Sequence, residues 1–324
     1  MSVMISSIRM LDQARAIHLS RRNGGVDPLA LTPEIRRHVG GLLPDHNRVS
    51  TIDRALLLFR SVIPAGQSFS FGGTSYSGLP AESGGLNVYC NTDCNNRLRR
   101  QTNGLPLPTD IINAPKHDAS RIAKCVEYSF LLISLLRAAD LEAHLVKDGL
   151  LHTYAAARLG GEWYKLDAFY IDKKLPPRFE LLPGPVEYLS ERLTLGLFHS
   201  NKAEVLKQQR HREKALMEVK TAIEIAPDLA EAWINYGAIL LELNGQGSAN
   251  EAMAAFKKAL SLEPDNSVAL NNAAVLLIKE GKRDEAKRIF NEILDREPGN
   301  ESARRNLVNL NGGPFLAGLL KGLL

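Results

Sequence analysis

The sequence predicts an α+β domain over residues 1–195, followed by an all-α array of helical repeats over residues 196–310. Three observations carry this fold class. An apolar run over residues 126–139 precedes two strand-like segments that flank a Gly-Gly pair. The second half repeats a pattern of alanine, phenylalanine and proline at a fixed period. The length of 324 residues also suits two domains.

Residues 126–139 are mostly apolar or aromatic, which is the pattern of a buried central helix. A run of about 14 residues is too short to cross a bilayer. Either Ser120 or Asp118 can cap the amino end of this helix, which places Cys125 in its first turns. There the positive end of the helix dipole stabilises a thiolate, the nucleophilic form of cysteine.

Residues 151–170 read as two strands joined at a Gly-Gly pair that begins at Gly160, a strong signal for a two-residue turn. With the turn at that pair, Tyr154 lies opposite Asp167. Side chains alternate between faces with period two, so His152 shares a face with Asp167. The two backbones are then diagonal neighbours roughly 7–8 Å apart. This spacing suits a base that is oriented by an acid.

Three helices are expected before this core. Residues 3–20 carry apolar side chains at near-helical spacing. A second helix is expected after Thr32, because proline and glutamate follow it. A third is expected after Ser50, which forms a capping-box pattern with Asp53, and should end before Pro64.

Residues 64–119 are rich in glycine, serine, asparagine and proline and predict a long insert without regular structure. Because the insert precedes the Cys125 helix, we expect part of it to line or cover the site. Cys90 and Cys94 lie in it with three residues between them. Two unpaired thiols are favoured over a zinc site, since no second pair of ligands is present. Residues 171–195 predict a proline-rich transition that ends in a short helix.

The stretch from Arg121 to Tyr170 resembles the core of the transglutaminase-like superfamily, which has a papain-like Cys-His-Asp arrangement. The resemblance rests on a helix-opening cysteine, an apolar helix ending in Leu-Arg-Ala, a histidine followed two residues later by an aromatic residue, and Trp-x-x-Leu-Asp: Cys125, Leu136-Arg137-Ala138, His152-Thr153-Tyr154 and Trp163-Tyr164-Lys165-Leu166-Asp167. It implies that Cys125 is the nucleophile, His152 the base and Asp167 the group that orients the imidazole.

The same stretch departs from the family pattern at three places. Ala123-Lys124 stands just before the cysteine, where the family has a glycine. Asp140 stands after the helix, where the family has another glycine. Tyr154 stands where the family has tryptophan. None of these changes removes a catalytic group, and the backbone N–H of Cys125 is expected to be one oxyanion donor.

The resemblance implies acyl transfer from a protein or peptide amide through a thioester at Cys125. Transfer to water gives a protease, amidase or deamidase, and transfer to an amine gives a transglutaminase. Activation by a metal is not expected, because no calcium-binding loop is visible, and the resemblance implies no cofactor. The alternative is a non-catalytic scaffold, in which a degenerate domain only binds and the repeats recruit partners.

The second half has an internal period of 34 residues and resembles the tetratricopeptide repeat family. The period separates three pairs of like residues: Ala252 and Ala286, Phe256 and Phe290, Pro264 and Pro298. An extra loop over residues 244–247 lengthens one unit. A weaker unit ends at Pro227, with its first helix near 199–209, and a final helix near 301–310 is expected to cap the array.

Stacked repeats of this kind form a concave surface that suits an extended peptide or a helix, so a protein or peptide partner is expected in the repeat groove. The alternative is that the repeats only stabilise the first domain or dimerise. Residues 311–324 form an apolar tail, which is expected to cover the last repeat. Association of this tail with a membrane is the less favoured alternative.

Composition and charge limit the kinds of partner, cross-link and cellular location that are expected. The chain is 44% hydrophobic and 23% charged with a net charge of +4, and its short basic runs do not favour a nucleic-acid partner. Three cysteines do not form a disulfide framework. The first residues have no unbroken apolar core of a secretory signal, so a cytoplasmic location is expected.

Overall fold

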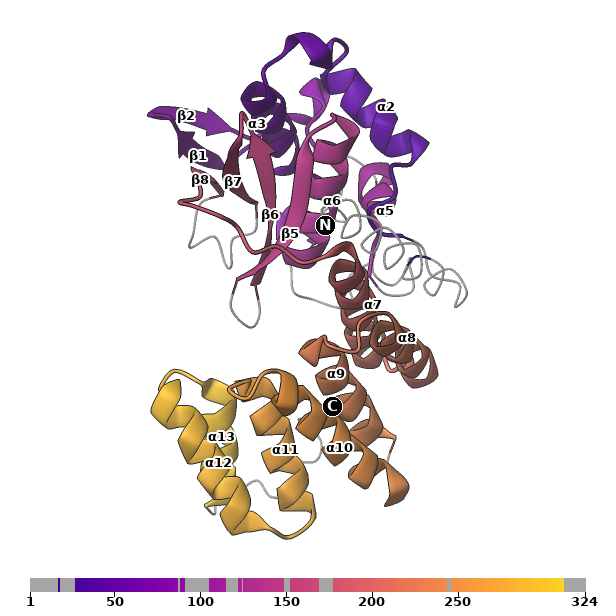
Figure 1. Ribbon diagram of the computed structural model, residues 1–324, viewed down its shortest axis with the longest axis vertical. Helices are drawn as coiled ribbons and strands as arrows, with labels where there is room; N and C mark the ends of the chain where they lie inside the picture. Colours follow the sequence, from indigo (N-terminus) through magenta and orange to yellow (C-terminus); the bar gives the residue numbers. More distant parts are fainter. Residues whose placement is uncertain are drawn as a thin grey trace, which may run out of the picture. The chain divides into compact units, whose positions relative to one another are not determined.

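The computed structural model describes residues 17, 27–86, 88–90, 105–114, 122–123, 125–148, 152–168, 177–243 and 246–311. The chain divides into two compact units, Met1–Phe198 and His199–Leu324, and each is described by itself (Figure 1). The helix expected over residues 3–20 lies outside the described residues apart from Ile17, and so do Cys94, the side chain of Cys90 and the tail beyond Asn311.

The helices of the first unit are α2 (Pro33–Leu42), η1 (His46–Arg48), α3 (Thr51–Val62), η2 (Ala81–Ser83), α5 (Pro108–Asn113) and α6 (Cys125–Ala138), and α7 (Glu191–Gln208) begins there. Two predicted helix starts are confirmed. Helix α2 begins after Thr32. Helix α3 is capped by Ser50, whose Oγ accepts a hydrogen bond of 3.1 Å from the Asp53 N–H, and α3 ends before Pro64.

Helix α6 is the central helix that the apolar run predicts. It begins at Cys125, and residues 126–136 are all buried. The helix packs against strands β5 and β6 of the main sheet (Figure 1). Asp140 ends it in the left-handed region at φ 56°, a conformation that aspartate adopts more readily than most residues. Arg54 donates to the Ala139 carbonyl at 2.7 Å and so joins α3 to the end of α6.

The main sheet is antiparallel, in the order β5 (Glu142–Asp148), β6 (His152–Leu159), β7 (Glu162–Asp167) and β8 (Arg178–Leu181). The predicted turn is confirmed, since Gly160 and Gly161 have φ of 61° and 98°. The β6–β7 register places Arg158 opposite Trp163, as a turn at the two glycines requires. This register therefore sets which residues of β6 and β7 lie near each other at the open end of the hairpin.

The expectation of an irregular insert over residues 64–119 is wrong for its described part. Residues 68–77 form a hairpin of β1 (Ser68–Phe71) and β2 (Thr74–Ser77), and its turn glycines have φ of 56° and 80°. Gly72 and Gly73, which contributed to the prediction of a loop, lie in the turn of this hairpin. Phe69 is buried, with its ring centroid 5.0 Å from that of Phe59, so apolar burial stabilises the hairpin.

The region after the main hairpin also contains more structure than predicted. Strand β8 lies in the segment expected to be a proline-rich transition, because Phe179 is buried there and contacts the Phe71 ring at 4.6 Å. Helix α7 starts at Glu191, earlier than the helix expected near residues 199–209. The division between the two units falls within this helix.

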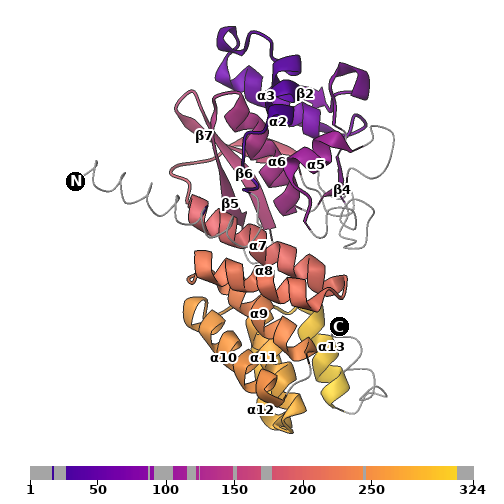
Figure 2. The ribbon, with the colours of Figure 1, turned by 90° about the vertical axis from the view of Figure 1, so that its right-hand side faces the viewer.

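The second unit consists of paired helices that follow the carboxyl-terminal part of α7 (Figure 2). They are α8 (Arg212–Ile225), α9 (Ala230–Glu242), α10 (Gln246–Leu262), α11 (Ser267–Lys279), α12 (Arg283–Arg296) and α13 (Glu301–Leu310). The final helix lies where the sequence predicts it. Helix α10 already begins at Gln246, so the loop expected over residues 244–247 is shorter than predicted.

The period of the sequence reflects helix packing. Phe256 and Phe290 are both 0% exposed in the core of the array. A Cβ added at Gly237 would lie 2.5 Å from the Phe256 ring, so α9 and α10 approach too closely for any larger residue. Successive units are also joined by asparagine, since Asn235 donates to Ser200 Oγ at 2.9 Å and Asn306 donates to Asn271 at 2.9 Å.

Candidate functional site: a cysteine, a histidine and an aspartate at the ends of three elements

The three predicted site residues each lie at the end of a regular element. Cys125 is the first residue of α6, His152 is the first residue of β6, and Asp167 is the last residue of β7. Because α6 packs on β6, and β6 pairs with β7, the fold brings these three ends to one place. The amino end of α6 therefore faces the imidazole that the hairpin presents.

His152 and Asp167 form a direct pair. The Nε2 atom of His152 lies 2.8 Å from Oδ2 of Asp167. The carboxylate is 9% exposed and the imidazole 28% exposed, so the pair is partly shielded from water. The diagonal arrangement predicted from the register brings the groups into contact. Since Nε2 contacts the carboxylate, Nδ1 is the ring nitrogen that can hydrogen-bond to the Cys125 thiol.

The surroundings of His152 favour its charged form. The hydrogen bond to Asp167 is the largest cause, followed by a hydrogen bond to Cys125, and together they raise the pKa of His152 to about 9. Burial opposes this shift. At neutral pH the imidazole is accordingly a cation held between the carboxylate and the thiol.

The surroundings of Cys125 favour the thiolate. Burial raises the pKa of this thiol, but hydrogen bonds from His152 and from Thr153 outweigh burial, and the net pKa is lowered. The side chain remains partly accessible. Ser129 donates to the Cys125 carbonyl at 2.7 Å and to the Thr153 carbonyl at 3.2 Å, which ties the first turn of α6 to β6. A thiolate beside an imidazolium is the pair that nucleophilic cysteine chemistry requires.

Sequence reasoning missed a lysine at this site. Lys165 is 8% exposed, and its Nζ lies 3.8 Å from Oδ2 of Asp167 and 3.3 Å from Oδ2 of Asp148. The same Nζ lies 4.2 Å from the centroid of the Tyr154 ring. The period of two along β7 could have found it, because a lysine two residues before Asp167 must share its face.

The insert reaches the neighbourhood of α6, the helix that begins at Cys125. Strand β3 (Tyr89–Cys90) pairs in parallel with β4 (Ile122–Ala123), directly before Cys125. The Tyr128 hydroxyl on α6 donates to the Val88 carbonyl. This agrees with the expectation that part of the insert lies close to the site, whereas its role as a lid stays a prediction.

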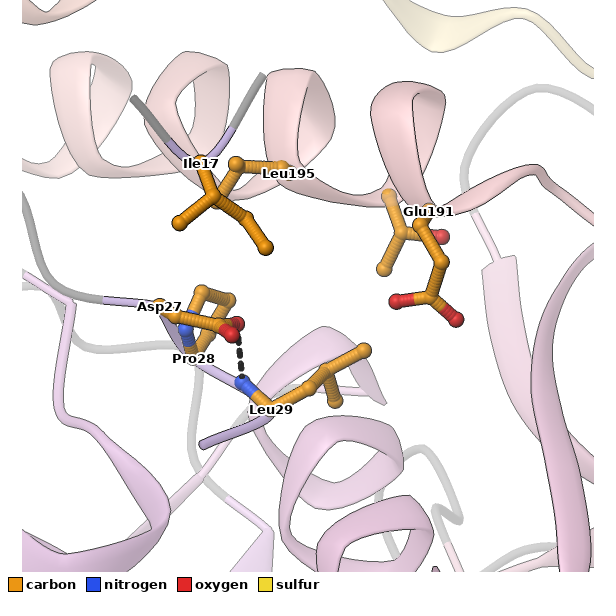
Figure 3. Close-up of a pocket in the computed structure, with 7 residues that line it drawn as sticks. Ile17, Asp27, Pro28, Leu29, Glu191 and Leu195 are labelled. Atoms are coloured by element: carbon orange, nitrogen blue, oxygen red, sulfur yellow. Dashed lines mark hydrogen bonds between the residues drawn. The ribbon is translucent and has the colours of Figure 1, made fainter. Parts of the chain in front are cut away.

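Cys125 does not line either of two hollows that described residues of the first unit form. One is lined by Ile17, residues 27–29 and α7 residues such as Glu191 (Figure 3). Its volume of about 10 Å³ is room for about one water molecule. The other, of about 470 Å³, lies between α2, α3 and β2 beside Arg60 and Tyr76. Within the described part of the chain, no group of three histidine, cysteine or acidic side chains could hold a metal ion.

The second unit has a polar cluster of its own. His199 Nδ1 lies 2.7 Å from Glu218 Oε2, and Lys202 Nζ lies 2.7 Å from Glu218 Oε1. His199 is 1% exposed, so this pairing joins α7 to α8 inside the unit. Burial raises the pKa of Glu218, but the hydrogen bond from His199 and the charge of Lys202 outweigh it, and the net pKa is lowered.

Comparison with known proteins finds the repeats. Residues 243–309 match the tetratricopeptide repeat family. The chain is 32% identical over 96 residues to protein O-mannosyl-transferase TMTC1 of Mus musculus, a match that covers 30% of this chain and 9% of that relative. The helical repeat array predicted for the second half is thereby confirmed.

Solved structures of tetratricopeptide domains are also similar. The first such domain of Spaghetti (RPAP3), bound to an HSP90 peptide, has a TM-score of 0.33 and 18% identity over 36% of this chain and 90% of that one. The Arabidopsis OM64 domain has a TM-score of 0.33 and 21% identity, covering 37% of this chain and 96% of that one.

Among the described residues, no helix combines the length and apolarity needed to cross a membrane. The resemblance of residues 121–170 to the transglutaminase-like superfamily stays a prediction.

Proposed function

We propose that this chain is a protein-interaction module whose helical repeats recruit a protein or a peptide. The match of residues 243–309 to the tetratricopeptide repeat family supports this most directly. Stacked helix pairs form an extended surface, and the first helices of successive units lie side by side where Asn306 of α13 reaches Asn271 of α11. A ligand that runs across the units would therefore contact α9, α11 and α13 together.

Photo-crosslinking from two matched lysine positions tests recruitment. Lys279 is exposed on α11 and Lys258 is exposed on the second helix of the preceding pair, α10. A crosslinking amino acid at residue 279 should capture a partner in cell extract, whereas the same group at residue 258 should not. Equal capture at both positions, or none at either, would argue against a ligand lying along the first helices.

The second proposed function is cysteine-dependent acyl transfer in the first unit, and the His152–Asp167 contact of 2.8 Å beside Cys125 supports it. The Cys125 thiolate attacks an amide carbonyl carbon and forms a C–S bond. The C–N bond breaks as the His152 imidazolium gives its proton to the leaving amine. Water or an amine then attacks the thioester, His152 takes a proton from it, and the C–S bond breaks. Asp167 holds the ring orientation throughout.

Acylation by an activated ester tests this chemistry without knowledge of the natural substrate. The full chain is treated with p-nitrophenyl acetate, and the acetyl group is located by peptide mass mapping. We expect acetyl on Cys125, its slow loss to water, and faster loss when a primary amine is added if an amine is the natural acceptor. Acetylation of Cys125 that is equally fast in His152→Ala would contradict the proposed role of the imidazole. The scaffold function would then stand alone.

A further inference from the structure

Lys165 and His152 contact the same carboxylate oxygen. Oδ2 of Asp167 lies 2.8 Å from His152 Nε2 and 3.8 Å from Lys165 Nζ. Asp167 thus lies between two cationic groups, one on its own strand and one on the neighbouring strand. The net stabilisation of each cation is then smaller than the carboxylate alone would give, because the two cations repel each other.

The position of Lys165 is fixed by more than Asp167. Asp148, at the end of β5, contacts the ammonium at 3.3 Å, and the Tyr154 ring packs beneath it at 4.2 Å. A lysine that is only 8% exposed has to be compensated in this way, since burial of an unpaired ammonium is costly. Asp148 itself is 58% exposed, so the two ion pairs of Lys165 connect an exposed carboxylate on β5 with the buried carboxylate of Asp167.

We infer that Lys165 is a positioning residue for the His152–Asp167 pair, which fixes the Asp167 carboxylate and limits the basicity of the imidazole through its charge. The inference deepens the proposed acyl-transfer function, on which its catalytic meaning rests. His152 must give a proton to the leaving amine, and a base that holds its proton too tightly is a poor acid. Lys165 offsets part of the attraction that Asp167 exerts on that proton.

The charges around the imidazole support this assignment. Asp167 and the Cys125 thiol act directly on the imidazole, Asp148 lies opposite His152 in the β5–β6 register, and Glu180 of β8 lies opposite Lys165. The titratable and charged groups around the pair are Cys125 of α6, Asp148 of β5, Tyr154 of β6, Lys165 of β7, and Arg178 and Glu180 of β8, where Arg178 lies opposite Asp167 in the strand register. Of the two cations among these described groups, Arg178 is exposed, whereas Lys165 is buried with its Nζ 3.8 Å from Asp167 Oδ2. Removal of Lys165 takes a buried positive charge away from the carboxylate oxygen that His152 also contacts.

An NMR titration of His152 tests the inference. The full chain carries ¹³C-labelled histidine and Cys125→Ala, which separates the imidazole from the thiol, and His152→Gln assigns the signal. We expect Lys165→Met to raise the pKa of His152 by about one unit, the effect of a unit charge about 6 Å away at a dielectric between those of a protein surface and water. Lys165→Arg keeps the charge and should leave the pKa unchanged.

Three features keep the outcome decisive. Lys165→Gln is a second neutral variant in case Lys165→Met does not fold, and a melting curve of each variant reports folding separately. An unchanged or lower pKa of His152 in the neutral variants would overturn the inference. Because the titration is made without Cys125, it can fail while Cys125 of the native chain is still acylated by an ester, and the reverse result is equally visible.

Discussion

Replacement of Asp167 by asparagine is the most informative single change in the first unit. Asparagine keeps the size and the hydrogen-bonding oxygen but removes the charge that faces His152 Nε2 at 2.8 Å. The hydrogen bond to Asp167 is the largest cause of the rise of the His152 pKa from 6.5 to about 9. Asp167→Asn should therefore return the pKa most of the way to 6.5.

The size of the effect follows from that shift. A fall of about two units is a loss of about 3 kcal/mol of preference for the imidazolium, before discounting for solvent around the partly exposed ring. At pH 7.5 the ring changes from mostly protonated to mostly neutral. The assay is the pH titration of the His152 ring signal by NMR in the native-cysteine chain.

A matched control comes from the same sheet. Glu162 is an exposed carboxylate at the Gly-Gly turn, and Glu162→Gln should leave the His152 titration in place. If Asp167→Asn titrates at the same pH as the native chain, Asp167 does not set the charge of the imidazole. The proposed division of roles within the site would then be wrong.

Other predictions concern the repeats. Gly237→Ala should destabilise the second unit by about 1–3 kcal/mol in denaturant unfolding, because the new Cβ meets the Phe256 ring, whereas Gly299→Ala, with nothing within 4 Å, should not be destabilising in this way. Phe290→Ala should cost about 3–5 kcal/mol, since its ring is fully buried; a loss below about 1 kcal/mol would contradict that core. Glu218 has a pKa lowered below 4.5, so its pairing stabilises the fold above that pH and is lost as the pH falls through the lowered pKa. Acid unfolding of Glu218→Gln should show a flatter pH dependence, and an identical profile would refute it.

Local patterns in the sequence were sufficient for the central elements of the first unit. The apolar run after Cys125 predicts α6, and the pair that begins at Gly160 predicts both the β6–β7 turn and its register. Since the register decides which side chains share a face, the contact between His152 and Asp167 followed from the turn alone. The 34-residue period predicted the helical repeat array of the second unit, because small and aromatic residues recur where helices approach each other.

The missed elements depend on contacts between distant parts of the chain. Strands β1 and β8 are short, and glycine or proline surrounds them, so composition alone indicates loops. They are strands because Phe71 and Phe179 pack together across more than a hundred residues of sequence. The period along β7 indicates the face of Lys165, but its pairing with Asp148 could not be predicted, since Asp148 belongs to a third strand whose register the hairpin does not fix.

The rate of alkylation of Cys125 as a function of pH tests the proposed thiolate–imidazolium pair most directly. Mass spectrometry resolves this cysteine from Cys90 and Cys94 in the native chain and in His152→Ala. We expect Cys125 to react quickly well below the reference thiol pKa of about 8.5, and His152→Ala to abolish that reactivity. If Cys125 reacts no faster than the other two cysteines, or equally in both chains, the pair does not exist and the repeats carry the function.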